Sequence, residues 1–134
     1  VVLKKGKDVT IVAVSGTVDD ALLASDILSK NNINAEVIDL RSIRPIDREC
    51  VIKSVQKTKK LVAIDSSWPL YGVSAEVLAM ILETPGLGNI SAKRVGVVDA
   101  HSPTSHALLV EYHPCAKNIV SAVFEIFGKE YSSN

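Results

Sequence analysis

The stretch VIDLRSIRPID, residues 37–47, joins an apolar, β-branched run to a turn with two arginines and a proline. Such runs are typical of buried strands, and Pro45 removes a backbone donor and fixes the direction in which the chain leaves the turn. Guanidinium groups are neither acids nor bases near neutral pH, but they pair with carboxylates and phosphates. We therefore expect Arg41 and Arg44 to fix position, as clamps to a carboxylate of this chain or of a neighbour. The candidate carboxylates in this chain are Asp39, Asp47 and Asp65.

Apolar runs of this kind alternate with segments of helical periodicity along the chain. We predict strands at residues 8–14, 34–40, 60–66 and 93–100, and helices at residues 17–32, 48–58, 73–84 and 116–128. Nearly continuous apolar strands that alternate with helices indicate a three-layer α/β/α fold with a mainly parallel sheet. Residues 1–134 are expected to form one domain, with a core of about residues 8–128 and a polar tail at 129–134.

The composition restricts the classes of partner. Fifteen basic side chains balance fifteen acidic ones, which argues against nucleic acid or an anionic membrane as a partner. No apolar run approaches the roughly 20 residues that a membrane-spanning helix needs. Cys50 and Cys115 form no CxxC pattern, so neither a disulfide framework nor a zinc site is expected. The chain opens with VVLKKGKDV, without a methionine or targeting signal, and is expected to be a fragment of a longer protein.

Right-handed crossovers place the strand-to-helix loops at the carboxyl edge of such a sheet, where ligands and partners bind. One loop, Ser15-Gly16-Thr17, could present backbone N–H groups to a phosphate. The motifs GxGxxG and GxxxxGK[ST] are absent, however, and Asp19 and Asp20 would repel an anion. We therefore predict that Thr17 caps the first helix, in a capping box with Asp20, and that Asp47 caps the second.

The other edge loops contain histidines and large aromatic residues. The spacing of the three histidines fits no standard zinc pattern, and the serines beside them lack the GxSxG motif of hydrolases. Only His101 lies where it could reach a neighbouring domain. Trp68 and Tyr71 share one loop, where they either cover the sheet edge or anchor an interface. Glu76 could act as a general base, but a carboxylate in a first helical turn more often interacts with the helix dipole. No catalytic, cofactor-binding or metal-ligating residue is therefore expected.

Several ordered motifs resemble a known family. VIDLRSIRPID, followed by VIKSVQKTKKLVAIDSSWPLYGVSAEV at 51–77, is similar to the C-terminal domain of the β subunits of 2-oxo acid dehydrogenase E1 components, with the pyruvate dehydrogenase members nearest. The Ile-Arg-Pro turn, the Ser-Val-x-Lys-Thr helix end and the Tyr-Gly-Val-x-Ala-Glu helix start carry the resemblance, which covers about residues 4–128. Transketolase and deoxyxylulose-phosphate synthase end in the same fold.

The resemblance implies that catalysis and subunit association are carried out by different parts of the parent enzyme. The complete enzyme of this family is an α2β2 assembly that uses thiamine diphosphate and Mg²⁺ to decarboxylate a 2-oxo acid and to acylate the lipoyl group of the E2 dihydrolipoyl acyltransferase. Its catalytic residues lie outside this domain, which supports association with the E1 α subunit and the second β subunit and helps to hold E2. The resemblance therefore implies that the domain alone is inactive. It places the parent in the mitochondrial matrix, with a plastid or the bacterial cytoplasm as alternatives.

The sequence departs from the family pattern in its loops. Asp65-Ser66-Ser67 stands where the family usually has glycines and a glutamate, and Asp99-Ala100-His101-Ser102-Pro103 lacks the first proline of Asp-x-Pro-x-Pro. Asn89 aligns with an acidic residue that helps to hold E2 in some members. These departures leave the 2-oxo acid and the details of E2 binding open.

The expected role of the domain rests on its surface. The interface or positioning candidates are Arg41, Arg44, Trp68, Tyr71, Glu76, Asn89 and His101. Three alternatives stay open. They are the same domain of a branched-chain 2-oxo acid dehydrogenase, the same domain of transketolase or deoxyxylulose-phosphate synthase, and a stand-alone α/β module that binds a small ligand at the carboxyl edge of the sheet.

Overall fold

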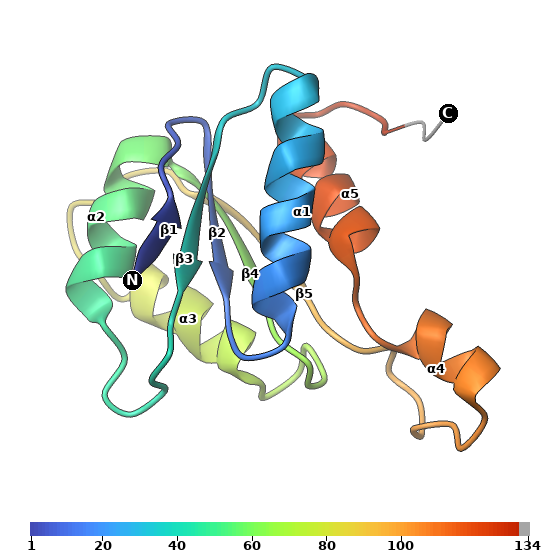
Figure 1. The fold of residues 1–134 in the computed structure, drawn as a ribbon. Helices are drawn as coiled ribbons and strands as arrows, with labels where there is room; N and C mark the ends of the chain where they lie inside the picture. The colour runs from blue at the N-terminus through green and yellow to red at the C-terminus, as the bar shows by residue number, and fades with distance from the viewer. Residues whose placement is uncertain (132–134) are drawn as a thin grey trace.

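The computed structural model describes residues 1–131, which form a five-stranded sheet covered by helices on both faces (Figure 1). The strands are β1 (Val2–Lys4), β2 (Val9–Ala13), β3 (Ala35–Asp39), β4 (Lys60–Ile64) and β5 (Ser91–Val95). The helices are α1 (Thr17–Lys30), α2 (Arg48–Thr58), α3 (Val73–Leu82), α4 (His106–Tyr112) and α5 (Ala116–Ile126).

The sheet is parallel except at one edge. The strand order is β1-β3-β2-β4-β5, and only β1 pairs antiparallel. All five residues of β2 are buried, as expected for a central strand with helices on both faces. The predicted α/β/α fold with a mainly parallel sheet is therefore confirmed.

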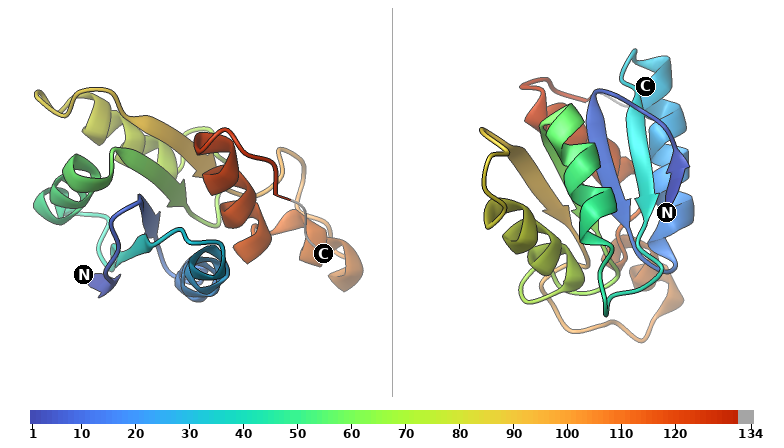
Figure 2. Two further views of the ribbon diagram at one scale, coloured as in Figure 1. Left: turned by 90° about the horizontal axis from the view of Figure 1, so that it is seen from above. Right: turned by 90° about the vertical axis from the view of Figure 1, so that its left-hand side faces the viewer.

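Neighbouring side chains of the central strands contribute to two separate apolar cores. Ile11 of β2 packs in the core under α1 and α5, and Val12 packs in the core under α2 and α3. Leu28 and Ile119 join the first core and Met80 joins the second, each of them almost completely buried. The end-on view of Figure 2 shows these two helical layers on either side of the sheet.

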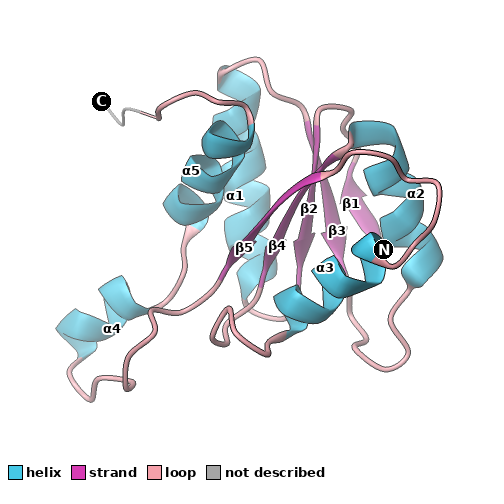
Figure 3. Cartoon of the chain, turned by 180° about the vertical axis from the view of Figure 1, so that it is seen from behind, coloured by secondary structure: helices cyan, strands magenta, loops and turns pink. Residues whose placement is uncertain are grey.

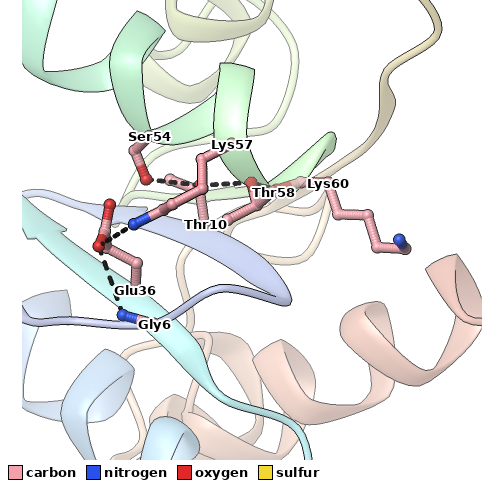
Figure 4. A network of polar contacts seen from close by, with 7 residues as sticks. All are labelled: Gly6, Thr10, Glu36, Ser54, Lys57, Thr58 and Lys60. Carbon is pink, nitrogen blue, oxygen red and sulfur yellow. Dashed lines mark hydrogen bonds and ion pairs between the residues drawn. The ribbon is translucent and has the colours of Figure 1, made fainter.

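A cluster of three hydroxyl groups lies between β2 and α2, on the side of the sheet that α2 and α3 cover (Figure 4). Thr10 Oγ1 of β2 lies 2.7 Å from Ser54 Oγ and 2.8 Å from Thr58 Oγ1, both on α2. All three residues are buried, so each hydroxyl needs a partner to offset the loss of water. The cluster therefore holds α2 in one register on the sheet.

The start of α1 differs from the prediction. Gly16 is the N-cap residue and no side chain caps the helix, so the predicted capping box of Thr17 and Asp20 was wrong. The buried Thr17 hydroxyl donates to Val14 O at 2.8 Å. Asp20 Oδ1 accepts from Ala116 N at 3.0 Å, at the first residue of α5. A contact between two helices has thus replaced the local cap.

Other boundaries were predicted with mixed success. Asp47 caps α2 as predicted, because its Oδ1 accepts from Cys50 N at 3.1 Å. The last strand was placed too late, since β5 ends at Val95 and residues 96–100 are outside it. Both β1 and α4 were missed. They are short, with three and seven residues and no buried residue in either, so neither carries a hydrophobic period.

Helix α4 stands to one side of the sheet (Figures 1 and 2). We call residues 98–113, which contain this helix, the α4 arm. Hydrogen bonds around Tyr112 hold it: Val98 N donates to Tyr112 O at 3.2 Å, and Tyr112 Oη donates to Ala100 O at 3.2 Å. The arm therefore closes on itself and buries little of its apolar surface.

Candidate interface at the carboxyl edge of the sheet

The loops that follow β2, β3, β4 and β5 lie along the carboxyl edge, because these four strands are parallel (Figure 3). Arg41 and Arg44 follow β3. Trp68 and Tyr71 follow β4, and His101 follows β5. The strand order places the β2 loop between the arginines and the other candidates. The sequence candidates at this edge therefore form two groups, one on each side of β2.

The arginine turn is held by the last residue of β3. Arg41 Nε lies 3.2 Å from Asp39 Oδ2, and Arg41 N donates to Asp39 Oδ1 at 3.0 Å. Arg41 adopts a positive φ of 53°, an uncommon conformation for a residue with a side chain. The arginine and the carboxylate thus fix each other at the end of the strand.

Arg44 makes no ion pair within the described residues and is exposed. The two other candidate carboxylates are used elsewhere, since Asp47 caps α2 and Asp65 binds the loop after β4. Arg44 is therefore free, within residues 1–131, to pair with a group outside this domain.

The loop after β4 is organised by one buried carboxylate. Asp65 is 2% exposed, and its Oδ2 accepts from Ser74 N at 2.6 Å in the first turn of α3. Its Oδ1 accepts from Ser67 N at 2.8 Å and Ser67 Oγ at 2.5 Å. A carboxylate at a helix N-terminus also interacts favourably with the helix dipole. Asp65 therefore fixes the loop and the start of α3 relative to β4.

Trp68 connects this loop to the α4 arm. Its Nε1 donates to Tyr112 Oη at 3.3 Å. The indole is nevertheless half-exposed, so this contact leaves an apolar face for a further partner. The roles left open for Trp68, covering the sheet edge and anchoring an interface, both stay predictions.

Tyr71 and Glu76 border a surface hollow of about 500 Å³ beside Leu70 and Arg94. Tyr71 is 99% exposed and has a φ of 63°. Arg94 Nη1 donates to Pro69 O at 2.5 Å, which links the loop to β5. The tyrosine ring therefore makes almost no contact in its own chain.

His101 lies at a second hollow, of about 320 Å³, on the α4 arm. Val98, Leu108 and Tyr112 are among its lining residues. The imidazole is exposed, and the walls are mainly apolar. This hollow suits an apolar side chain of a partner better than a reaction.

Asn89 is not part of this edge. It lies between α3 and β5, so it precedes a parallel strand and belongs to the opposite, amino edge. Its side chain is exposed. The structure therefore separates Asn89 from the other interface candidates.

The acidic, histidine and cysteine side chains of this edge bear on metal binding and catalysis. Within residues 1–131 no three His, Cys, Asp or Glu side chains are grouped so that they could hold a metal ion. Glu76 is exposed, and no hydrogen bond joins it to a nucleophile in the described part of the chain. In the same part, no helix has the length and apolar character needed to span a membrane.

Three residues that matter at this edge were missed or misassigned from the sequence. Asp65 was considered only as a partner for arginine, although an Asp two residues before Ser67 suits a local side-chain turn. Arg94 and Tyr112 had no signal, because their partners, Pro69 and Trp68, lie 25 and 44 residues away.

Comparison with known proteins agrees with this fold. The chain is 40% identical over 129 residues to the mitochondrial pyruvate dehydrogenase E1 component subunit β of Drosophila melanogaster, covering 95% of this chain and 35% of that protein. The corresponding subunit of Bos taurus is 42% identical over 122 residues, covering 90% and 34%. The chain thus spans about a third of the length of these curated relatives.

A solved structure is similar as well. A chain described as a split gene transketolase, inactive beta4 tetramer, matches 98% of this chain and 43% of its own length, with a TM-score of 0.86 and 33% identity. The class is therefore the α/β domain that ends transketolase-like proteins. Residues 1–119 match the family described as transketolase, C-terminal domain, and the chain belongs to that family. The resemblance to pyruvate dehydrogenase E1 β subunits is confirmed.

Proposed function

We propose that this chain serves as the C-terminal domain of the β subunit of a pyruvate dehydrogenase E1 component, and that its role there is assembly. The parent enzyme would decarboxylate pyruvate oxidatively and acetylate the lipoyl group of E2. The domain would contact the E1 α subunit, a second β subunit and E2, and would be inactive alone. Relatives that are 38–42% identical over about nine-tenths of the chain or more support this proposal.

The observation that carries the assembly role is the apolar surface of the α4 arm. Leu108 and Val110 are 57% and 69% exposed, and α4 has no buried residue. Large exposed apolar side chains that gather on one element mark a surface for a partner. Tyr71, at the same edge, adds an aromatic side chain of the type enriched at interface hot spots.

The residues of this domain do not fit thiamine diphosphate with Mg²⁺. A pyrophosphate needs donors at a loop or helix N-terminus, and its Mg²⁺ needs oxygen ligands. The first turn of α1 instead carries Asp19 and Asp20, which repel an anion. No cluster of acidic ligands occurs in the described residues. The cofactor would therefore bind to other parts of the parent enzyme.

The proposed location is the mitochondrial matrix. The relatives from fly, cattle, yeast and pea are all named as mitochondrial subunits.

The assembly role is tested in the parent β subunit, co-expressed with the E1 α subunit. Replacing Leu108 and Val110 together by aspartate should prevent formation of the α2β2 assembly on size-exclusion chromatography with light scattering. The fold should persist, because neither side chain is buried. Leu23→Asp is the matched control, since Leu23 is 55% exposed on α1. Assembly that survives the double substitution, or fails equally with the control, would contradict the proposal.

A transketolase parent is the second candidate. It is favoured by the 0.86 TM-score and 33% identity to the split gene transketolase. Activity assays of the assembled parent distinguish the two, because only the proposed enzyme reduces lipoyl-E2 at the expense of pyruvate.

A further inference from the structure

A groove lies between β1 and α2, away from the carboxyl-edge candidates. Its volume is about 490 Å³, and its lining residues are Val2, Lys5, Glu36, Cys50, Lys53, Ser54 and Lys57. Volumes of about 300–1,000 Å³ with mostly apolar walls and a few polar groups are typical of small-molecule sites. We call this feature the β1–α2 groove.

One side of α2 forms a wall of the groove. Three residues follow Cys50 on the same face of the helix: Lys53, Ser54 and Lys57, which come three, four and seven residues after it. The opposite wall comes from Val2 of β1 and from Lys5 after it. The groove therefore forms only when the edge strand pairs with β3.

The charges in the groove are not balanced. Glu36 is 5% exposed, and its Oε2 accepts from Lys57 Nζ at 2.6 Å and Gly6 N at 3.3 Å (Figure 4). Burial opposes ionisation of Glu36, but hydrogen bonds from Lys57, Ser54 and Gly6 N outweigh it and lower the carboxyl pKa. Glu36 therefore stays ionised at neutral pH and neutralises Lys57.

Two other ammonium groups have no such partner. Lys5 and Lys53 make no ion pair among the described residues, and both are exposed at the groove. Burial raises the pKa of the Cys50 thiol, which keeps it neutral. The groove thus combines an apolar wall with the positive charges of Lys5 and Lys53, and the terminal ammonium of Val1 adds a further charge near Cys50.

We propose that the β1–α2 groove binds a small organic anion, a carboxylate with an aliphatic body, with its head between Lys5 and Lys53 and its body against Val2 and Cys50. Charge complementarity selects an anion over a cation. No aromatic residue lines the groove, so a nucleobase would have no ring on which to stack.

The site can be tested by protection of Cys50 from alkylation. The chain would carry Cys115→Ser, so that only Cys50 reacts, and an acetylated Val1, so that the terminal ammonium adds no charge near the groove. Hexanoate is the probe, acetate supplies the head alone, and hexanol supplies the body alone. Iodoacetamide labelling at pH 8 should slow in a saturable way with hexanoate, and not with acetate or hexanol at equal concentration.

Charge removal then tests the position of the head. Lys5→Ala with Lys53→Ala should raise the half-saturating hexanoate concentration about tenfold, which corresponds to about 1.4 kcal/mol. The control pair, Lys117→Ala with Lys129→Ala, removes the same charge from exposed positions on and after α5. Unsaturable protection, equal protection by hexanol, or equal loss in both pairs would overturn the proposal. Each outcome is independent of whether the parent subunit assembles.

Discussion

Replacing Asp65 by alanine should destabilise the domain by about 3–6 kcal/mol, because one buried carboxylate holds the β4–α3 loop. Asp65 accepts from Ser74 N at 2.6 Å and from Ser67 N and Oγ at 2.8 and 2.5 Å. Alanine removes all three acceptor contacts. Ser74 is almost fully buried, so water does not replace the carboxylate at its N–H.

The magnitude follows from these contacts. A buried donor that loses a charged acceptor costs about 1.5–3 kcal/mol, and each of the two partly buried Ser67 donors costs about 0.5–1 kcal/mol. Loss of the carboxylate at the start of α3 adds about 0.3–1 kcal/mol through the helix dipole. For a chain of 134 residues, the total corresponds to a fall in Tm of about 10–25 °C.

Urea denaturation followed by circular dichroism measures the free energy of unfolding directly. Asp26→Ala is the matched control, because Asp26 is exposed and pairs only with Lys4, at 2.7 Å. That variant should change the free energy of unfolding very little, because solvent screens an exposed ion pair. Asp65→Asn, which keeps an acceptor but not the charge, should lie between the two. A loss in Asp65→Ala no greater than in the control would refute the role given to this carboxylate.

Three further predictions concern other contacts. Gly72→Ala should cost about 1–3 kcal/mol in thermal denaturation, since the new Cβ would overlap Ser67 Oγ and Trp68 O; an unchanged Tm would contradict this packing. The lowered pKa of Glu36 in the folded state means that its contribution to stability is complete above pH about 5 and is lost as the pH falls through the lowered value. The unfolding free energies of wild type and Glu36→Gln should therefore converge on acidification in urea titrations, and a pH-independent difference would count against the effect. Arg41→Glu places a second negative charge beside Asp39 at the end of β3. It should weaken α2β2 assembly of the parent subunit, measured by size-exclusion chromatography, while the circular dichroism spectrum is retained. Normal assembly would show that the turn has no positioning role.

In the loop after β4 the sequence departs from the family pattern, and the residues found there hold the loop in place by contacts with one another. Asp65 and Ser67 form a local side-chain turn. Gly72 gives room for that turn, because a side chain there would overlap Ser67 and Trp68. The loop is thus held by a buried acid and a glycine seven residues apart.

The sequence alone determined the central parallel strands of the sheet and the family. Residues 9–13 and 61–64 are buried throughout, and a strand of that kind requires cover on both faces, which the intervening helices supply. The cap of α2 was also predictable, because Asp47 binds Cys50 N only three residues away. Such features depend on neighbours in the chain, so a local pattern encodes them.

Tertiary structure decided the features that depend on distant partners. Asp20 binds the start of α5 across 96 residues in place of its predicted cap, and Asn89 lies at the edge opposite the other candidates. The β1–α2 groove depends on the pairing of β1 with β3, which puts Lys5 and Lys53 in the lining of one groove. The exposure of the α4 arm was likewise decided by packing, because nothing in residues 1–131 covers Leu108 and Val110, which are 57% and 69% exposed.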